Sequence, residues 1–199
     1  MSDVSRRDLL RNVALSAALG GLTAEAAQHV HAMAADDKKV AGGVYKPKAF
    51  NPQEWTSLRR LCDLIIPADS HSKGALEAGA PEFIDLLSSQ NKEIAEMYTG
   101  GLAWLDTESK RRYSAAFAAA KPEQQTELLD LIAYRKSAEQ HPELGPGIRF
   151  FDWARKMTAD AYYTSKAGIA DLGFVGNKGM AEFQVPVEAV EYALKRSGL

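Results

Sequence analysis

Apolar residues recur three and four positions apart over most of the chain after residue 50, which is the period of helices that bury one face. The first such stripe follows Asn51-Pro52, where an asparagine cap, a proline in the first turn and Glu54 are typical of a helix start. We predict a helix from there to about Ile66. Cys62 belongs to its apolar face, so we expect the thiol in the core rather than beside a substrate.

The same period continues towards the C-terminus and decides the fold class. It predicts a short helix after Pro81, a longer one from about Lys92, and further helices after Pro122, over Ile148–Ser165 and after Pro186. The pattern gives no convincing strand. We therefore predict an all-α fold, in which residues 51–199 form a single compact domain of about five to seven helices.

The positions of aromatic residues and glycines indicate which parts of this domain are buried, closely packed or irregular. Ile148–Ser165 carries apolar residues around its whole circumference, which indicates a helix that is central or covered by a partner. Gly100 and Gly101 interrupt a helical pattern, so we expect another helix or a partner to approach closely there. Residues 166–184 are rich in glycine and predict a long loop before the last helix.

The first 34 residues have the features of a secretory leader. Arg6 and Arg7 precede a weakly apolar run over Val13–Leu22, and Ala32-Met33-Ala34 matches a small-x-small peptidase site. The order Ser-Arg-Arg-x-Leu-Leu favours a twin-arginine export signal over an ordinary Sec signal and predicts a periplasmic protein. The run is too short to favour a retained membrane anchor. Residues 35–50 are polar and without a period, so we expect a linker or extended arm.

Composition and charge narrow the function classes. The 199 residues include 24 Lys and Arg against 26 Asp and Glu, a formal net charge of −2. A chain without a large positive field is not a nucleic-acid binder. The single cysteine excludes an intramolecular disulfide, an iron–sulfur cluster and a covalent haem within this chain.

Candidate chemistry is sparse. Asp69 and His71 share a predicted loop and can be drawn as a metal or acid/base pair, but no third ligand stands near, so a solvated polar loop is favoured. His29 and His31 lie inside the predicted leader, and His141 is the one other histidine of the sequence. No nucleophile motif or phosphate loop occurs, so we assign no catalytic, cofactor-binding or metal residue. An interaction or structural role is the default.

Several stretches of the chain resemble one known family. Residues 61–69 (LCDLIIPAD) and 74–85 (GALEAGAPEFID) look like the D-x-I-I-P, G-A-x-x-A-G and F-I-D opening of the gluconate 2-dehydrogenase subunit 3 family. Ser72-Lys73 departs from the proline common there. The family's C-terminal signature is similar to Phe150-Phe151, Met157-Thr158, Tyr162–Ser165 and residues 172–177 (LGFVGN). The likeness covers roughly residues 51–184.

This resemblance implies a small, non-catalytic subunit of a membrane-associated, flavin-dependent sugar or sugar-acid dehydrogenase. It implies that FAD sits in a catalytic partner similar to glucose–methanol–choline oxidoreductases, and that a c-type cytochrome subunit takes the electrons. It also implies that the small subunit helps the flavoprotein to fold and escorts it through the twin-arginine translocase. The alternatives are a free-standing periplasmic binding or scaffold module, and an enzyme with its site in the Asp69/His71 loop.

The apolar helix and the glycine-rich loop also suggest where a partner binds. A monomer of this size rarely leaves large aromatic side chains uncovered. We therefore expect Trp153, Tyr163 and Phe174 to contact the flavoprotein.

Overall fold

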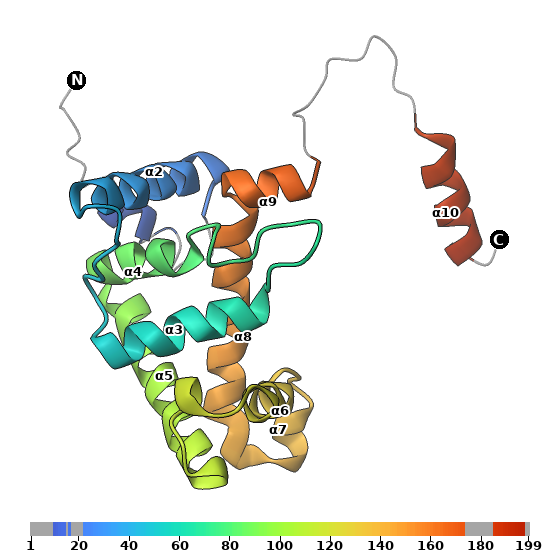
Figure 1. Cartoon of the computed structure of the whole chain (residues 1–199). Helices are drawn as coiled ribbons and strands as arrows, with labels where there is room; N and C mark the ends of the chain where they lie inside the picture. The colour runs from blue at the N-terminus through green and yellow to red at the C-terminus, as the bar shows by residue number, and fades with distance from the viewer. Residues whose placement is uncertain (1–9, 15, 17–21, 174–184, 198–199) are drawn as a thin grey trace.

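The protein is built from helices in the part of the chain that is described. The computed structural model describes residues 10–14, 16, 22–173 and 185–197, and these contain no strand. The all-α prediction is confirmed. Residues 10–14 and 16 are helical. The further elements (Figure 1) are α2 (Ala24–Val40), α3 (Pro52–Ile65), α4 (Ala80–Gln90), α5 (Lys92–Tyr113), the 3-10 turn η1 (Phe117–Ala119), α6 (Pro122–Ile132), α7 (Ser137–Gln140), η2 (Pro142–Leu144), α8 (Gly145–Tyr163), α9 (Lys166–Asp171) and α10 (Val187–Ser197).

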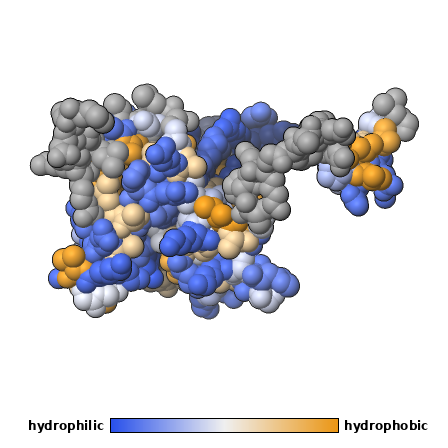
Figure 2. Space-filling view, turned by 90° about the horizontal axis from the view of Figure 1, so that it is seen from above, coloured by the Kyte–Doolittle hydropathy of each residue, from blue (hydrophilic) through white to orange (hydrophobic). Residues whose placement is uncertain are grey.

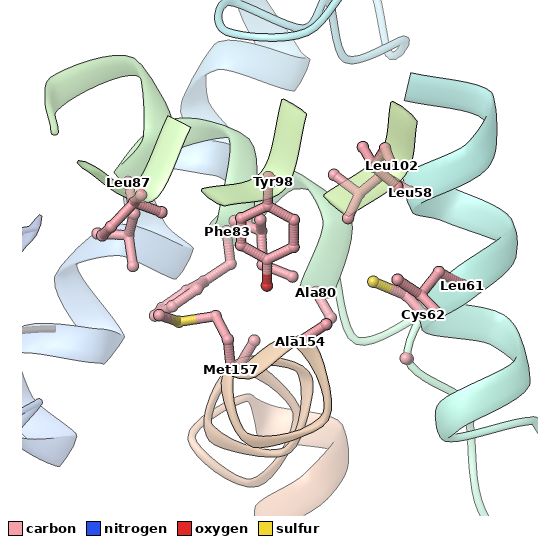
Figure 3. Close-up of a cluster of buried hydrophobic side chains, with 14 of the residues drawn as sticks. Leu58, Leu61, Cys62, Ala80, Phe83, Leu87, Tyr98, Leu102, Ala154 and Met157 are labelled. Atoms are coloured by element: carbon pink, nitrogen blue, oxygen red, sulfur yellow. The ribbon is translucent and has the colours of Figure 1, made fainter. Parts of the chain in front are cut away.

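Two helices, α4 and α8, form the centre of the body. Every residue of α4 from Ala80 to Ser88 is buried, because α2, α3, α5 and α8 all pack against it. The long helix α8 contacts α3, α4, α5, α6 and α9, which confirms its predicted central place. Figure 3 shows Phe83 of α4, Tyr98 of α5 and Met157 of α8 meeting in the shared core.

The thiol of Cys62 also lies in this core, as predicted. None of its surface is exposed, and its Sγ is 3.7 Å from Thr158 Oγ1 of α8. Burial raises the pKa of the thiol to about 12. The group is therefore protonated at neutral pH and is not a nucleophile.

One face of α8 is charged and exposed, which corrects the expectation of an apolar circumference. Arg149, Lys156 and Asp160 are exposed along it. Asp152 lies between Lys156 and Arg135, with one carboxylate oxygen 2.9 Å from the side-chain nitrogen of each. These residues recur at helical spacing, so they occupy the side of α8 that is turned away from the core.

Glycines allow α5 and α8 to approach closely. An added Cβ would lie 2.0 Å from the Phe150 ring at Gly101 and 2.3 Å from the Trp104 ring at Gly147. The close approach predicted for the glycine pair in α5 is therefore confirmed at Gly101. Its neighbour Gly100 faces open space, with nothing within 4 Å of an added Cβ.

Two segments that fell outside the predicted helices are helical. Gly145-Pro146-Gly147 forms the first turn of α8. Proline is tolerated there because backbone N–H groups in the first turn of a helix have no partner within the helix. Residues 166–171 form α9, capped by Ser165 Oγ, which accepts the Gly168 N–H at 3.1 Å. The expected loop over 166–184 is thus wrong for its first part, and residues 174–184 lie outside the described residues.

The N-terminal helix α2 covers one side of α4 and crosses the expected leader boundary. The boundary after Ala34 falls inside this helix, and residues 35–40 are helical rather than part of a linker. The side chain of Thr23 caps its first turn by accepting the Ala26 N–H at 3.2 Å. The buried residues of α2 are Ala27, Val30, Met33 and Ala34.

The expected arm exists over residues 44–50, but it is fastened to α4. Asp85 has no exposed surface, and its carboxylate accepts the Tyr45 hydroxyl at 2.8 Å. It also accepts the backbone N–H groups of Lys48 and Ala49 at 2.8 and 2.9 Å. Tyr45 and Phe50 are themselves buried. The arm is therefore part of the folded body.

The last helix, α10, lies apart from the body (Figure 1). It confirms the helix predicted after Pro186, and all of its residues are exposed. Val187, Val190 and Leu194 lie on one side of it, and Figure 2 shows apolar side chains gathered there. Within the described ranges, no helix combines the length and the apolar character that a bilayer span requires.

Candidate functional site

A groove of about 990 Å³ lies where α2, the loop between α3 and α4, and α9 meet. We call it the α2–α9 groove. Each of the three elements contributes a lysine to its lining: Lys38 from α2, Lys73 from the loop and Lys166 from α9. Glu77 and Asp171 also line it. The groove therefore has charges of both signs along its walls.

The α3–α4 loop is held in shape by its own backbone. The Ala75 N–H donates to the Ile66 carbonyl at 2.8 Å and closes the loop. An added Cβ on Gly74 would lie 2.5 Å from the backbone nitrogen of Ala68, so a larger residue does not fit beside this closure. Gly79 has a φ of 79°, the left-handed conformation that glycine adopts without strain, directly before α4.

Asp69 serves the backbone of this loop. Its Oδ1 accepts the N–H groups of His71 and Ser72, each at 2.7 Å. These bonds hold the pKa of the carboxyl below its usual value. His71 is exposed and lines the groove. The arrangement agrees with the polar-loop interpretation, because the carboxylate is engaged by a local turn rather than aimed at a reacting group.

His31 is one of four groove residues that the sequence places in the leader, with Gln28, Ala32 and Ala34. Its ring stacks on Phe83 with the centroids 4.8 Å apart, and its Nε2 is 3.2 Å from Thr164 Oγ1. The Thr164 hydroxyl donates to the Asp160 carbonyl at 2.6 Å, so we assign the proton of the first bond to His31 Nε2. Burial lowers the pKa of His31 and favours the neutral ring.

This geometry gives His31 a packing role. With the proton assigned to Nε2, this nitrogen donates to Thr164 and does not act as a base towards that hydroxyl. The sequence carries one signal for this role. Ala27, His31 and Ala34 are four and three positions apart, so in a helix they share one face.

Glu82 is the buried charge of the groove. Its side chain is 9% exposed, and Oε1 lies 3.7 Å from Arg59 Nη1. The other oxygen, Oε2, is buried and has no hydrogen-bond partner among the described residues. An unpaired buried acceptor costs free energy. This cost falls on the folded state, since the oxygen is buried.

The two predicted contact residues that the structure describes, Trp153 and Tyr163, lie apart on α8. Trp153 packs against the core, and its Nε1 is buried without a hydrogen-bond partner in the described part of the chain. Tyr163 ends α8 beside the groove and is 43% exposed. Trp153 and Tyr163 are ten positions apart, which corresponds to about 15 Å along the helix axis. Phe174 lies outside the described residues, as do Arg6 and Arg7.

The remaining histidine lies at a different hollow. His141 Nδ1 is 3.2 Å from Glu143 Oε1, and the residue lines a depression of about 860 Å³ formed with α3 and α6. Over the ranges that the structure covers, no three His, Cys, Asp or Glu side chains form a group that can hold a metal ion.

The fold is a helical domain in which α2, α3, α5 and α8 pack around the buried helix α4. A closed loop precedes α4, and the arm is fastened to it at Asp85. The family model for gluconate 2-dehydrogenase subunit 3 matches residues 52–180, and the chain belongs to this family. The resemblance inferred from the motifs is confirmed. No curated protein and no solved structure matches the chain.

The motifs that carried the resemblance build this part of the fold. Gly74 and Gly79 shape the loop, Asp85 fastens the arm, and Ser165 caps α9. These positions surround the α2–α9 groove or fix the elements that form it. The signature therefore has a structural explanation in its described residues.

Proposed function

We propose that the protein is the small, non-catalytic subunit of a membrane-associated, flavin-dependent sugar or sugar-acid dehydrogenase. In this proposal it assists the maturation of the catalytic flavoprotein and its export by the twin-arginine pathway to the periplasm. The observation that carries the proposal is the family match over residues 52–180. The Arg6-Arg7 leader supports the export role. FAD belongs to the partner, and a c-type cytochrome subunit takes the electrons.

The way in which polar side chains are engaged supports a role without chemistry of its own. Asp69 accepts hydrogen bonds from its own loop, and Asp85 accepts them from the arm. The Nε2 of His31 is engaged by Thr164. Each of these groups holds the fold together, which supports a role in presenting surfaces to a partner.

The proposal includes a contact of the flavoprotein with Trp153, Tyr163 and Phe174. Aromatic anchors dominate many interfaces, and truncation of such an anchor to alanine costs about 2 kcal/mol, or more than tenfold in affinity. Tyr163 is better placed than Trp153, because it is 43% exposed whereas Trp153 packs against the core. Alanine variants that keep their circular dichroism spectrum should recover less flavoprotein on co-purification. Cys62→Ser is the control, since that side chain is buried.

Export is tested by replacing Arg6 and Arg7 with lysine in cells that also produce the flavoprotein. We expect both proteins to stay in the cytoplasm, because the partner depends on the leader of this chain. Arg11→Lys is the matched control, since it changes a leader arginine outside the pair. Cell fractionation gives the result. Arrival of the flavoprotein in the periplasm without this subunit would contradict the escort role.

A further inference from the structure

The position of α2 bears on where the exported chain begins. The sequence pattern puts a peptidase site at Ala32-Met33-Ala34. In the structure, these residues lie in the middle of a helix that begins at Ala24 and ends at Val40. The local start and stop signals agree with the structure, because Thr23 caps the first turn and Lys38 and Lys39 lie in the last.

The inner face of α2 is part of the core. Ala27 and Val30 have no exposed surface, and Met33 and Ala34 are 8% and 7% exposed. All four belong to the same hydrophobic cluster as Phe83 of α4. Cutting after Ala34 would remove this whole face and leave one side of α4 uncovered.

A second set of contacts ties α2 to distant parts of the chain. His31 reaches Thr164, which is 133 residues away in sequence. Near the other end, Asp37 Oδ2 is 2.6 Å from Lys48 Nζ of the arm, and the arm in turn is fastened to Asp85. The helix is therefore held at its middle and at its C-terminal end.

We propose that the peptide bond after Ala34 is not the processing point and that α2 stays in the exported subunit as a structural part of the domain. Proteases cut where the backbone is exposed and can leave its hydrogen bonds. A twin-arginine substrate meets the peptidase already folded, so the residues around Ala34 are then helical and packed. Leu22 and Thr23 precede α2, lie outside any helix and are not buried. Leu10, Val13 and Ala14 before them are buried in the same hydrophobic cluster as α2, so among the described residues the accessible backbone on this side of α2 is that of residues 22 and 23.

This inference rests on the export role in the proposed function, so the experiment reads location and chain end separately. The full chain is produced in a host with a working twin-arginine pathway, and the periplasmic and cytoplasmic fractions are purified. Intact mass and N-terminal sequencing of the periplasmic protein should give a chain that begins at or before Ala24. A periplasmic chain that begins at Ala35 would overturn the inference and leave the export role intact. A chain confined to the cytoplasm would contradict the export role instead.

A pair of variants tests α2 independently of where the protein is found. Val30→Ala removes buried methyl groups, whereas His29→Ala changes the exposed neighbour. If α2 is retained, Val30→Ala lowers the unfolding temperature of the purified protein by about 4–8 °C, and His29→Ala leaves it unchanged. Equal unfolding temperatures for both variants would show that α2 does not stabilise the protein, and the inference would be wrong.

Discussion

A single buried carboxylate decides where the arm lies. Asp85 accepts three donors from residues 45–49, although none of its own surface is exposed. We expect Asp85→Asn to lower the free energy of unfolding by about 3 kcal/mol, because the amide places donors against backbone N–H groups and removes the charge that strengthened these bonds. Urea unfolding followed by circular dichroism measures the effect.

Tyr45→Phe is the control for this prediction. It removes one hydroxyl donor to Asp85 and keeps the ring in place, so we expect a smaller loss of about 1.5 kcal/mol. If both variants unfold at the wild-type urea concentration, the arm is not fastened through Asp85.

Glu108 of α5 gives the stability a dependence on acidic pH. Arg111 and Arg112 each hold its Oε1 at 2.6 Å, and the hydrogen bond from Arg111 is the main cause that lowers the pKa of the carboxyl from 4.5 to about 2. A carboxyl whose pKa is lowered by folding stabilises the folded state at every pH above its unfolded-state pKa of 4.5. This stabilisation is lost as the pH falls towards 2.

We therefore expect Glu108→Gln to unfold more easily than the wild type at pH 5 to 7, with a constant difference over that range. The difference should shrink below about pH 4.5 and be lost as the pH falls through about 2, below which the wild-type carboxyl is protonated as well. Thermal unfolding of both proteins across this range provides the measurement. A difference that does not change with pH would rule out the ion pairs as its cause.

At the scale of elements, the crossing of α5 and α8 depends on one glycine of an adjacent pair. Gly101→Ala places a methyl group inside the Phe150 ring position, 2.0 Å from its nearest atom. We expect this substitution to cost about 1–3 kcal/mol, as overpacking does elsewhere. Gly100→Ala meets nothing within 4 Å and should stabilise the protein by up to about 1 kcal/mol, because alanine favours the helix. Chemical denaturation of the two variants measures their free energies of unfolding. Changes of the same sign in both variants would contradict this geometry.

At the scale of the whole molecule, the body and α10 differ in what they contribute to stability. Leu194 of α10 is 51% exposed, whereas Leu128 of α6 has no exposed surface. We expect Leu194→Ala to change the free energy of unfolding by less than about 0.5 kcal/mol and Leu128→Ala to lower it by about 2–5 kcal/mol. Calorimetry of both variants tests this difference. A large loss with Leu194→Ala would mean that α10 packs on the body in solution.

Signals that act within one turn made much of this fold predictable. Asn51, Pro52 and Glu54 form the capping arrangement at the start of α3, and prolines open α4, α6 and α8. Their effects depend on backbone geometry alone. The same local reading failed over 166–171, because Gly168 looks like a loop residue. Glycine is needed at this position because an added Cβ would lie only 2.1 Å from the carbonyl oxygen of Tyr162.

The candidate site was less predictable because its parts come from distant segments. The sequence identified the α3–α4 loop and the family, but it assigned His31 to a discarded leader. The inner face of α2 consists of alanines with Val30 and Met33, and such an apolar stripe does not differ in composition from a leader until its packing on α4 is known. Nothing near Glu82 in sequence indicates that one of its oxygens lacks a donor.

The sequence by itself therefore determined the all-α class, most helix starts, the family and the buried place of Cys62, since caps, period and motifs are local properties. Only the tertiary structure decided that α2 belongs to the body, that Gly101 rather than Gly100 faces α8, and that Asp85 holds the arm. The physical reason is the same in each case. Packing partners 36 to 133 residues apart meet only after the chain has folded.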